Sequence, residues 1–294
     1  MKTITAIHHQ RREGLVEGFR RALTVIAMAG VSIMTGNMAI AQSAFTNRPF
    51  INGEVIKYNA YYKWGILMPK AGEASLTFSE KKLNGDITNR YKLLFHSSGM
   101  VESVYSMRDT LESVFNNDMI LQEATKRTND DKYYSVDKLS FSYRNDSTFA
   151  HSLRYDRKRV KIDTTLVATG EVFDIVGAVL FLRSLDWDNY HPGKRIPFKT
   201  VMGRDVINAF FIYKGQEIIE KGNVKYRTRR FTIDIYDDAF TDSKGAADLW
   251  VGDDKNRIPI KIRAKLKIGA AEVFYKESSG LRYPLDCRVE VKKR

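Results

Sequence analysis

The chain has 294 residues, of which 43% are hydrophobic and 28% are charged, and its formal net charge is +13. Its single cysteine excludes a disulfide within the chain and a cysteine-based metal cluster. The excess of positive charge favours anionic partners, and outside the cytoplasm these are phosphorylated lipids or glycans sooner than nucleic acid. The plainer interpretation is that basic side chains keep a β-rich surface soluble and its strand edges unpaired.

The first 41 residues have the pattern of a secretory signal peptide. A basic segment precedes the apolar run 22–36, and Ala39-Ile40-Ala41 then supplies the small-x-small motif of a cleavage site. We expect cleavage near Ala41, a single β-rich exported domain over residues 42–294, and a location in the periplasm or at the outer-membrane periphery. An uncleaved anchor is the alternative, because the basic segment is long. Residues 1–41 contain five Lys or Arg and two Glu, so about +10 of the +13 charge remains after cleavage.

Alternation of apolar and polar side chains begins after Gly53. In Glu54–Trp64 every second residue is apolar, which predicts a strand with an aromatic inner face. Asn84-Gly85 lies between two more alternating segments and is a strong hairpin signal. Short alternating segments at such regular spacing are typical of sandwiches, barrels and strongly curled sheets. They cover residues 73–81, 86–96, 103–115, 120–127, 133–143, 149–155 and 159–167.

The segment Glu171–Trp187 contains the one stretch of the exported part that predicts a helix. Between residues 172 and 185 apolar side chains recur at helical spacing, Asp174 can cap the start, and Arg183 suits the negative end of the helix dipole. Roughly fourteen residues are too few to cross a bilayer, which needs about twenty. We therefore predict a core helix packed against a sheet, with Gly177 marking a close approach of another backbone. A helix that docks on a partner or a membrane is the alternative.

Strand patterns resume after the helix, in residues 196–202, 206–214, 217–220, 225–236, 246–252, 257–268, 271–277 and 283–291. No linker, repeat or low-complexity segment interrupts them, which favours one domain. The predicted fold is mainly β: a curled antiparallel sheet, half-barrel or barrel-like, with one central core helix at about 172–185. The β-rich halves on either side of the helix would form either one continuous sheet or two packed lobes.

The sequence lacks the local signatures of common catalytic and metal sites. His96, His151 and His191 are scattered without the spacing of metal ligands, and the hydrolase, nucleotide and dinucleotide motifs are missing. Adjacent acids such as Asp253-Asp254 are typical of turns and do not make an acid/base couple. We predict neither an enzyme nor a metal or other cofactor.

Two features could form a binding site. Aromatic side chains that line a curled sheet leave an apolar groove beside the helix, and the candidates are Tyr58, Tyr62, Trp64, Phe173 and Phe181. Basic side chains alternate along one face of a later strand and form a candidate anion site of Lys261, Arg263, Lys265 and Lys267. Ordinary core packing and a solvated outer face are the respective alternatives.

The segment Leu249–Ile260, LWVGDDKNRIPI, combines a strand, an Asp-rich turn and a returning strand. Further motifs are Gly53-Glu54 followed by Tyr58, Ala71-Gly72, Phe173-Asp174-Ile175 with Phe181-Leu182-Arg183, and Gly269. Together they resemble an uncharacterised family of exported bacterial envelope proteins, domain of unknown function 3108, over essentially the whole mature chain. The resemblance implies a β-rich exported protein of Bacteroidota type with no established activity or catalytic residues. The architecture is also similar to periplasmic lipoprotein-carrier and lipid-binding half-barrels.

We therefore expect a non-catalytic periplasmic or cell-envelope protein that binds an amphipathic or anionic envelope component, such as a lipid or lipid-linked glycan. The acyl part would contact the aromatic candidates, and the anionic head would contact the basic strand. A structural or assembly factor that recognises an envelope protein, or a glycan hydrolase with converging carboxylates, are the alternatives. The expected partners are an envelope lipid, an anionic glycan or an envelope protein, with peripheral membrane contact and no nucleic acid.

Overall fold

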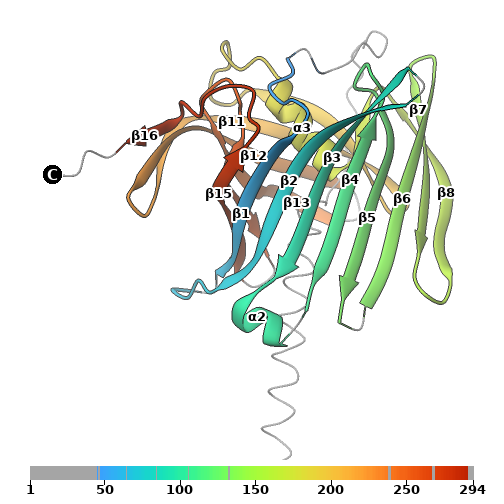
Figure 1. Cartoon of the computed structure of the whole chain (residues 1–294). Coiled ribbons are helices and arrows are strands. Elements are labelled where there is room, and N and C mark those ends of the chain that lie inside the picture. Colours follow the sequence, from blue (N-terminus) through green and yellow to red (C-terminus); the bar gives the residue numbers. More distant parts are fainter. Residues whose placement is uncertain are drawn as a thin grey trace, which may run out of the picture.

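The structure is a computed structural model that describes residues 45, 47–63, 65–83, 85–104, 106–131, 133–237, 240–266 and 269–290. In this part of the chain, sixteen strands form one sheet that curls into a nearly closed barrel (Figure 1). Strand β15 pairs with β1, so the two β-rich halves make one continuous sheet and not two lobes. The predicted signal peptide lies outside the described residues.

The first half is an antiparallel meander followed by the core helix. Its elements are β1 (Glu54–Lys63), β2 (Lys70–Leu83), β3 (Asp86–Ser97), α2 (Gly99–Val104), β4 (Arg108–Phe115), β5 (Leu121–Asp130), β6 (Tyr133–Arg144), β7 (Ser147–Tyr155), β8 (Val160–Thr169), β9 (Val172–Phe173) and α3 (Ile175–Ser184). The second half comprises β10 (Arg195–Met202), β11 (Asp205–Lys221), β12 (Val224–Asp237), β13 (Phe240–Gly252), β14 (Pro259–Lys265), β15 (Ala270–Ser279) and β16 (Arg288–Glu290).

The predicted alternation places one face of each strand inside the barrel. In β1 the side chains of Glu54, Ile56, Tyr58, Ala60 and Tyr62 are buried, and those between them are exposed or half-buried. Successive side chains of a strand point to opposite faces of the sheet, so this pattern lines the interior with the apolar set. The mainly β fold with a central helix is thereby confirmed.

Helix α3 lies inside the barrel near one end (Figure 1) and packs against β3, β4, β9 and β10. The helix is three residues shorter at its start than predicted, because Val172 and Phe173 pair in parallel with β10 before Asp174 caps the helix. Gly177 does not mark a close approach of another backbone. A Cβ at this position would instead meet the Asp174 carboxylate at 2.7 Å and the Phe115 ring at 3.4 Å.

Two other predictions change in the structure. The segment predicted as a strand from Ser103 begins with the short helix α2, and β4 starts only at Arg108. The Glu102 carboxylate holds this turn by accepting hydrogen bonds from Arg108 at 2.6 and 3.0 Å. Residues 206–214 and 217–220 form one strand, β11, because Gly215 adopts a φ of 118° at a bulge and lets the pairing with β12 continue.

Candidate ligand-binding site

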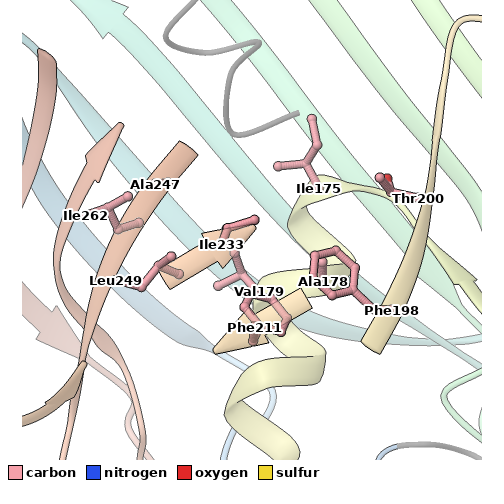
Figure 2. A pocket seen from close by; sticks show the side chains of 10 residues that line it. All are labelled: Ile175, Ala178, Val179, Phe198, Thr200, Phe211, Ile233, Ala247, Leu249 and Ile262. Atoms are coloured by element: carbon pink, nitrogen blue, oxygen red, sulfur yellow. The ribbon is translucent and has the colours of Figure 1, made fainter. Parts of the chain in front are cut away.

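A cavity lies between α3 and strands β10–β14, inside the barrel. Figure 2 shows its lining of Ile175, Ala178, Val179, Phe198, Thr200, Phe211, Ile233, Ala247, Leu249 and Ile262. Nine of these side chains are hydrocarbon, and Thr200 provides the one hydroxyl. The volume of the cavity is about 30 Å³, which is room for a water-sized group.

The Thr200 hydroxyl has no hydrogen-bond partner in the described part of the chain, although the residue is only 7% exposed. Its strand is fixed on one side by β11 and on the other by the parallel pairing of Thr200 with Phe173. A buried hydroxyl without a partner costs about 1–3 kcal/mol. A ligand group that accepts or donates a hydrogen bond here would recover this cost.

Asp174 sets the start of α3. Its carboxylate accepts hydrogen bonds from the backbone N–H groups of Val176 and Gly177, at 3.3 and 3.1 Å, and from the Ser113 hydroxyl at 2.7 Å. Burial raises the pKa of Asp174 to about 6, against the opposing effect of these hydrogen bonds, the one from Ser113 foremost. The predicted N-cap is therefore confirmed, and Ser113 ties it to β4.

Arg183 fixes the other end of α3 through a buried ion pair. Its guanidinium donates to both Glu54 carboxylate oxygens, at 2.6 and 2.9 Å, and to the Asn256 backbone oxygen at 3.0 Å. Arg183 and Glu54 are both fully buried. Burial alone would lower the pKa of Arg183, but Glu54 raises it above its ordinary value. The sequence interpretation, a cation at the negative helix end, missed this pairing.

The sheet stays open at a seam between β8, one end of the strand order, and the β10–β11 hairpin; the other end, the two-residue β9, pairs only with β10 in the part of the chain that the structure describes. In the described residues no backbone ladder crosses the seam, and three side chains bridge it instead. Ser152 Oγ donates to the Gly203 oxygen at 2.6 Å, Lys199 Nζ to the Thr169 oxygen at 2.5 Å, and an Arg204 nitrogen to the Lys161 oxygen at 3.1 Å. A depression of about 310 Å³ opens on the seam, lined by Ser147, Val167, Ala168, Thr169, Lys199, Val206 and Asn208.

The predicted aromatic residues occupy two places. Phe173 and Phe181 stack with ring centroids 4.9 Å apart, and Phe45 packs edge-on against both. Tyr58 and Tyr62 are buried on the inner face of β1, and the Tyr58 hydroxyl has no partner in the described part of the chain. Neither group lines the cavity, whose α3 contribution is Ile175, Ala178 and Val179. Trp64 lies outside the described residues.

The predicted basic residues lie on the outer face of β14. Lys261 and Arg263 approach the nearly buried Glu272 carboxylate, at 3.3 and 3.5 Å, and Lys63 approaches it at 3.8 Å. Lys261 also lies over the Trp250 and Phe274 rings, 4.8 and 4.9 Å from their centroids. Lys265 is exposed, and Lys267 lies outside the described residues. Strand β14 lies between β13 and β15 in the sheet.

Asp109 and Asp130 form a buried acid pair that sequence reasoning missed. Both residues are almost fully buried, and their side chains share a hydrogen bond. Burial, and then the neighbouring Asp130, raise the pKa of Asp109. Glycosidases of either stereochemistry keep their two carboxyl groups about 5–10 Å apart, so a directly hydrogen-bonded pair does not match that arrangement. The sequence does contain a pattern that predicts the burial of Asp109, because Asp109 falls on the same strand face as the inward residues Leu111 and Ser113.

Within the described ranges no three His, Cys, Asp or Glu side chains converge as metal ligands. In the same ranges no helix is long and apolar enough to cross a membrane.

The curled sheet and internal helix define a β-barrel-like protein. The chain belongs to the family described as protein of unknown function (DUF3108), whose model matches residues 57–276, and the resemblance seen in the sequence is confirmed. It is similar in fold to a β-barrel-like protein of the domain of unknown function DUF1849 from Brucella abortus, with a TM-score of 0.54, 10% identity, and coverage of 78% of this chain and 98% of that chain.

A protein with a YmcC-like fold from Bacteroides fragilis also matches, with a TM-score of 0.34, 7% identity, and coverage of 79% of this chain and 97% of that chain. No curated protein matches the chain in sequence.

Proposed function

We propose that the chain is a non-catalytic binding protein of the bacterial cell envelope, and that it takes the apolar part of a lipid or lipid-linked glycan into the barrel beside α3. The observation that carries this proposal is the cavity with nine hydrocarbon side chains and one unpartnered hydroxyl, Thr200. Hydrocarbon walls with a single polar group suit a ligand whose buried part is a hydrocarbon chain with few polar atoms.

The barrel must widen to accept such a ligand, because about 30 Å³ admits one water-sized group and an acyl chain needs far more. The seam is the place where widening costs least. Its three bridging hydrogen bonds contribute about 1 kcal/mol each, whereas separating two of the long strands would break a whole ladder of backbone hydrogen bonds. Burying acyl CH₂ groups contributes about 0.8 kcal/mol each, so a few of them offset the opening.

Lys199 is the best-placed contact for an anionic head group. It precedes Thr200 in β10 and therefore points to the opposite, outer side of the sheet, where it lines the seam depression. Partial burial lowers the pKa of Lys199, which a bound anion would counteract. Lys261 and Arg263 already balance the negative charge of Glu272. Lys199 is therefore a stronger candidate for contact with the head group than the predicted basic strand.

Native mass spectrometry with lipid extraction tests this proposal, on the chain as recovered from a Gram-negative host. Thr200→Val removes the unpartnered hydroxyl, so the ligand-free protein gains about 1 kcal/mol of stability while lipid affinity falls about fivefold. Thr232→Val is the matched control, because Thr232 is also 7% exposed with an unpartnered hydroxyl but lies on the opposite face of its strand from Ile233. A lipid-free wild type, or equal retention by both variants, would refute the proposal.

Recognition of an envelope protein by strand addition is a second candidate. Its supporting observation is β8, which pairs with β7 on one side and with no strand on the other in the described residues. A photo-crosslinking residue at Val167, which is 58% exposed, would capture a protein if β8 recruits a strand. Crosslinks to lipid alone would favour the first function.

A further inference from the structure

The connection between β1 and β2 exposes an apolar tip. Ile66 is 100% exposed, Leu67 58% and Met68 37%, and the three residues follow one another between Gly65 and Pro69. Figure 1 shows this connection projecting at the end of the barrel that carries α2, away from α3. Three consecutive exposed apolar side chains on a protruding loop are unfavourable in water and indicate a surface that covers them.

An excess of positive charge surrounds this tip. Lys63, Lys261 and Arg263 share the Glu272 carboxylate, and Lys70 and Lys276 share that of Glu73, so five cations face two acids. Lys265 extends the charge, because it pairs with Ala270, which pairs in turn with Lys63. Lys221, from the β11–β12 hairpin, lies close enough to Lys70 for the two charges to repel. Burial, and then this repulsion, lower the pKa of Lys221.

We propose that this apolar tip and the lysines Lys63, Lys70 and Lys265 dock the protein on the surface of an anionic lipid membrane. The tip enters the boundary between head groups and acyl chains, while the long lysine side chains reach lipid phosphates. A projecting tip with flanking cations matches a fluid anionic interface, whereas a protein partner would require a pocket shaped for these three side chains. The inference does not depend on the cavity, so either proposal can fail without the other.

Vesicle co-sedimentation tests the docking surface, with the chain as recovered from a Gram-negative host and vesicles of phosphatidylcholine with or without phosphatidylglycerol. The wild type should bind the anionic vesicles, and less strongly at high salt. The Ile66→Ser/Leu67→Ser variant should bind at least about tenfold more weakly, because it loses two buried apolar side chains. Lys63→Gln/Lys70→Gln should lose about fivefold per lysine and leave Glu272 and Glu73 with their other cations.

Matched control variants distinguish binding through this surface from non-specific binding to vesicles. Leu94→Ser/Ile218→Ser removes exposed apolar side chains elsewhere, 41% and 63% exposed. Lys81→Gln/Lys82→Gln removes exposed charge at the opposite end of β2. Both variants should bind as the wild type does. No binding to anionic vesicles, or the same loss in the controls, would overturn the proposal.

A fluorophore at Ile66→Cys reports the position of the tip directly. Cys287, the chain's only natural cysteine, is buried, and burial raises the pKa of its thiol, so it will not compete for the label. On anionic vesicles the emission should shift to the blue as the label leaves water. Vesicle binding without this shift, or a shift on self-association without vesicles, would assign the tip to another partner.

Discussion

Asp109 is a carboxyl group whose pKa the barrel interior raises. Burial and the adjacent Asp130 carboxyl both raise its pKa. The nearby Lys126 cation, and then the Asn129 N–H, which donates to Asp109 at 3.3 Å, only partly oppose them. Asp174 has a raised pKa of about 6 for the same first reason, burial. Each group binds its proton more tightly in the folded protein than in the unfolded chain.

These raised values determine the sign of the pH dependence. The tighter proton binding stabilises the folded state. This stabilisation is fully present below the unfolded pKa of Asp, near 3.8. It is lost as the pH rises through the folded pKa of each group, which is about 6 for Asp174 and higher for Asp109. Asp109→Asn mimics the protonated acid, so it should raise the free energy of unfolding at pH 8 by about 1–3 kcal/mol and have little effect at pH 4. Urea unfolding at both pH values measures this.

The control for Asp109→Asn is Asp118→Asn, since Asp118 lies exposed in the β4–β5 turn. It should leave the pH profile unchanged. A profile of Asp109→Asn that runs parallel to that of the wild type would show that the acid pair ionises freely.

At the scale of elements, α3 owes its place to two polar contacts more than to its sequence pattern. Asp174 joins its start to β4, and Arg183 joins its end to β1 and to the turn before β14. Between them, one side of the helix carries Phe181, which stacks on Phe173, and the other side faces the cavity. A helix held at both ends keeps the cavity beside it small.

Removing one member of the buried ion pair should be severe. Glu54→Gln leaves Arg183 as a buried charge without its carboxylate, so the free energy of unfolding should fall by about 3–5 kcal/mol in urea titrations. The double variant Glu54→Leu/Arg183→Leu should be closer to the wild type, because it leaves no uncompensated charge.

The matched control for this pair is Glu277→Gln, because Glu277 and its partner Lys57 are both about half exposed, and water screens such a pair, so its loss should change the free energy of unfolding far less. Equal losses for Glu54→Gln and Glu277→Gln would contradict a structural role of the buried pair.

For the whole molecule, the proposed opening of the barrel depends on the seam, which no backbone ladder crosses in the described residues. Thr169 directs its oxygen to Lys199 across the seam, whereas the Gly170 N–H bonds back to Asp146. Alternate residues of a strand direct their backbone groups the same way, so the N–H groups of Asp163, Thr165 and Val167 also point to the seam. Those of Thr164 and Leu166 point to β7.

Hydrogen exchange should therefore alternate along β8. The three N–H groups that face the seam should exchange at least about tenfold faster than those of Thr164 and Leu166, because side chains bridge the seam and no ladder protects them. A bound ligand that holds the seam open or covers it should change the first set alone. Uniform protection along β8 would show that the barrel is as firmly closed here as elsewhere.

Local pattern by itself determined much of this protein. The period of two predicted the strands and their inward faces, the period near 3.6 predicted the helix, and Asp174 was correctly placed as its cap. The motifs also indicated the family. These features depend on neighbours within a few residues of one another, where backbone geometry fixes which side chains share a face.

Only the tertiary structure decided which faces meet. Alternation gives the two faces of a strand but not the order of the strands. The contacts of Glu272 with cations of β14 and β1 could therefore not be predicted. The same is true of the ion pair between Arg183 and Glu54, which are 129 residues apart. The same holds for Thr200, whose hydroxyl meets a cavity only because α3 lies inside the barrel. Long-range packing sets these contacts, and its energy is spread over many strands.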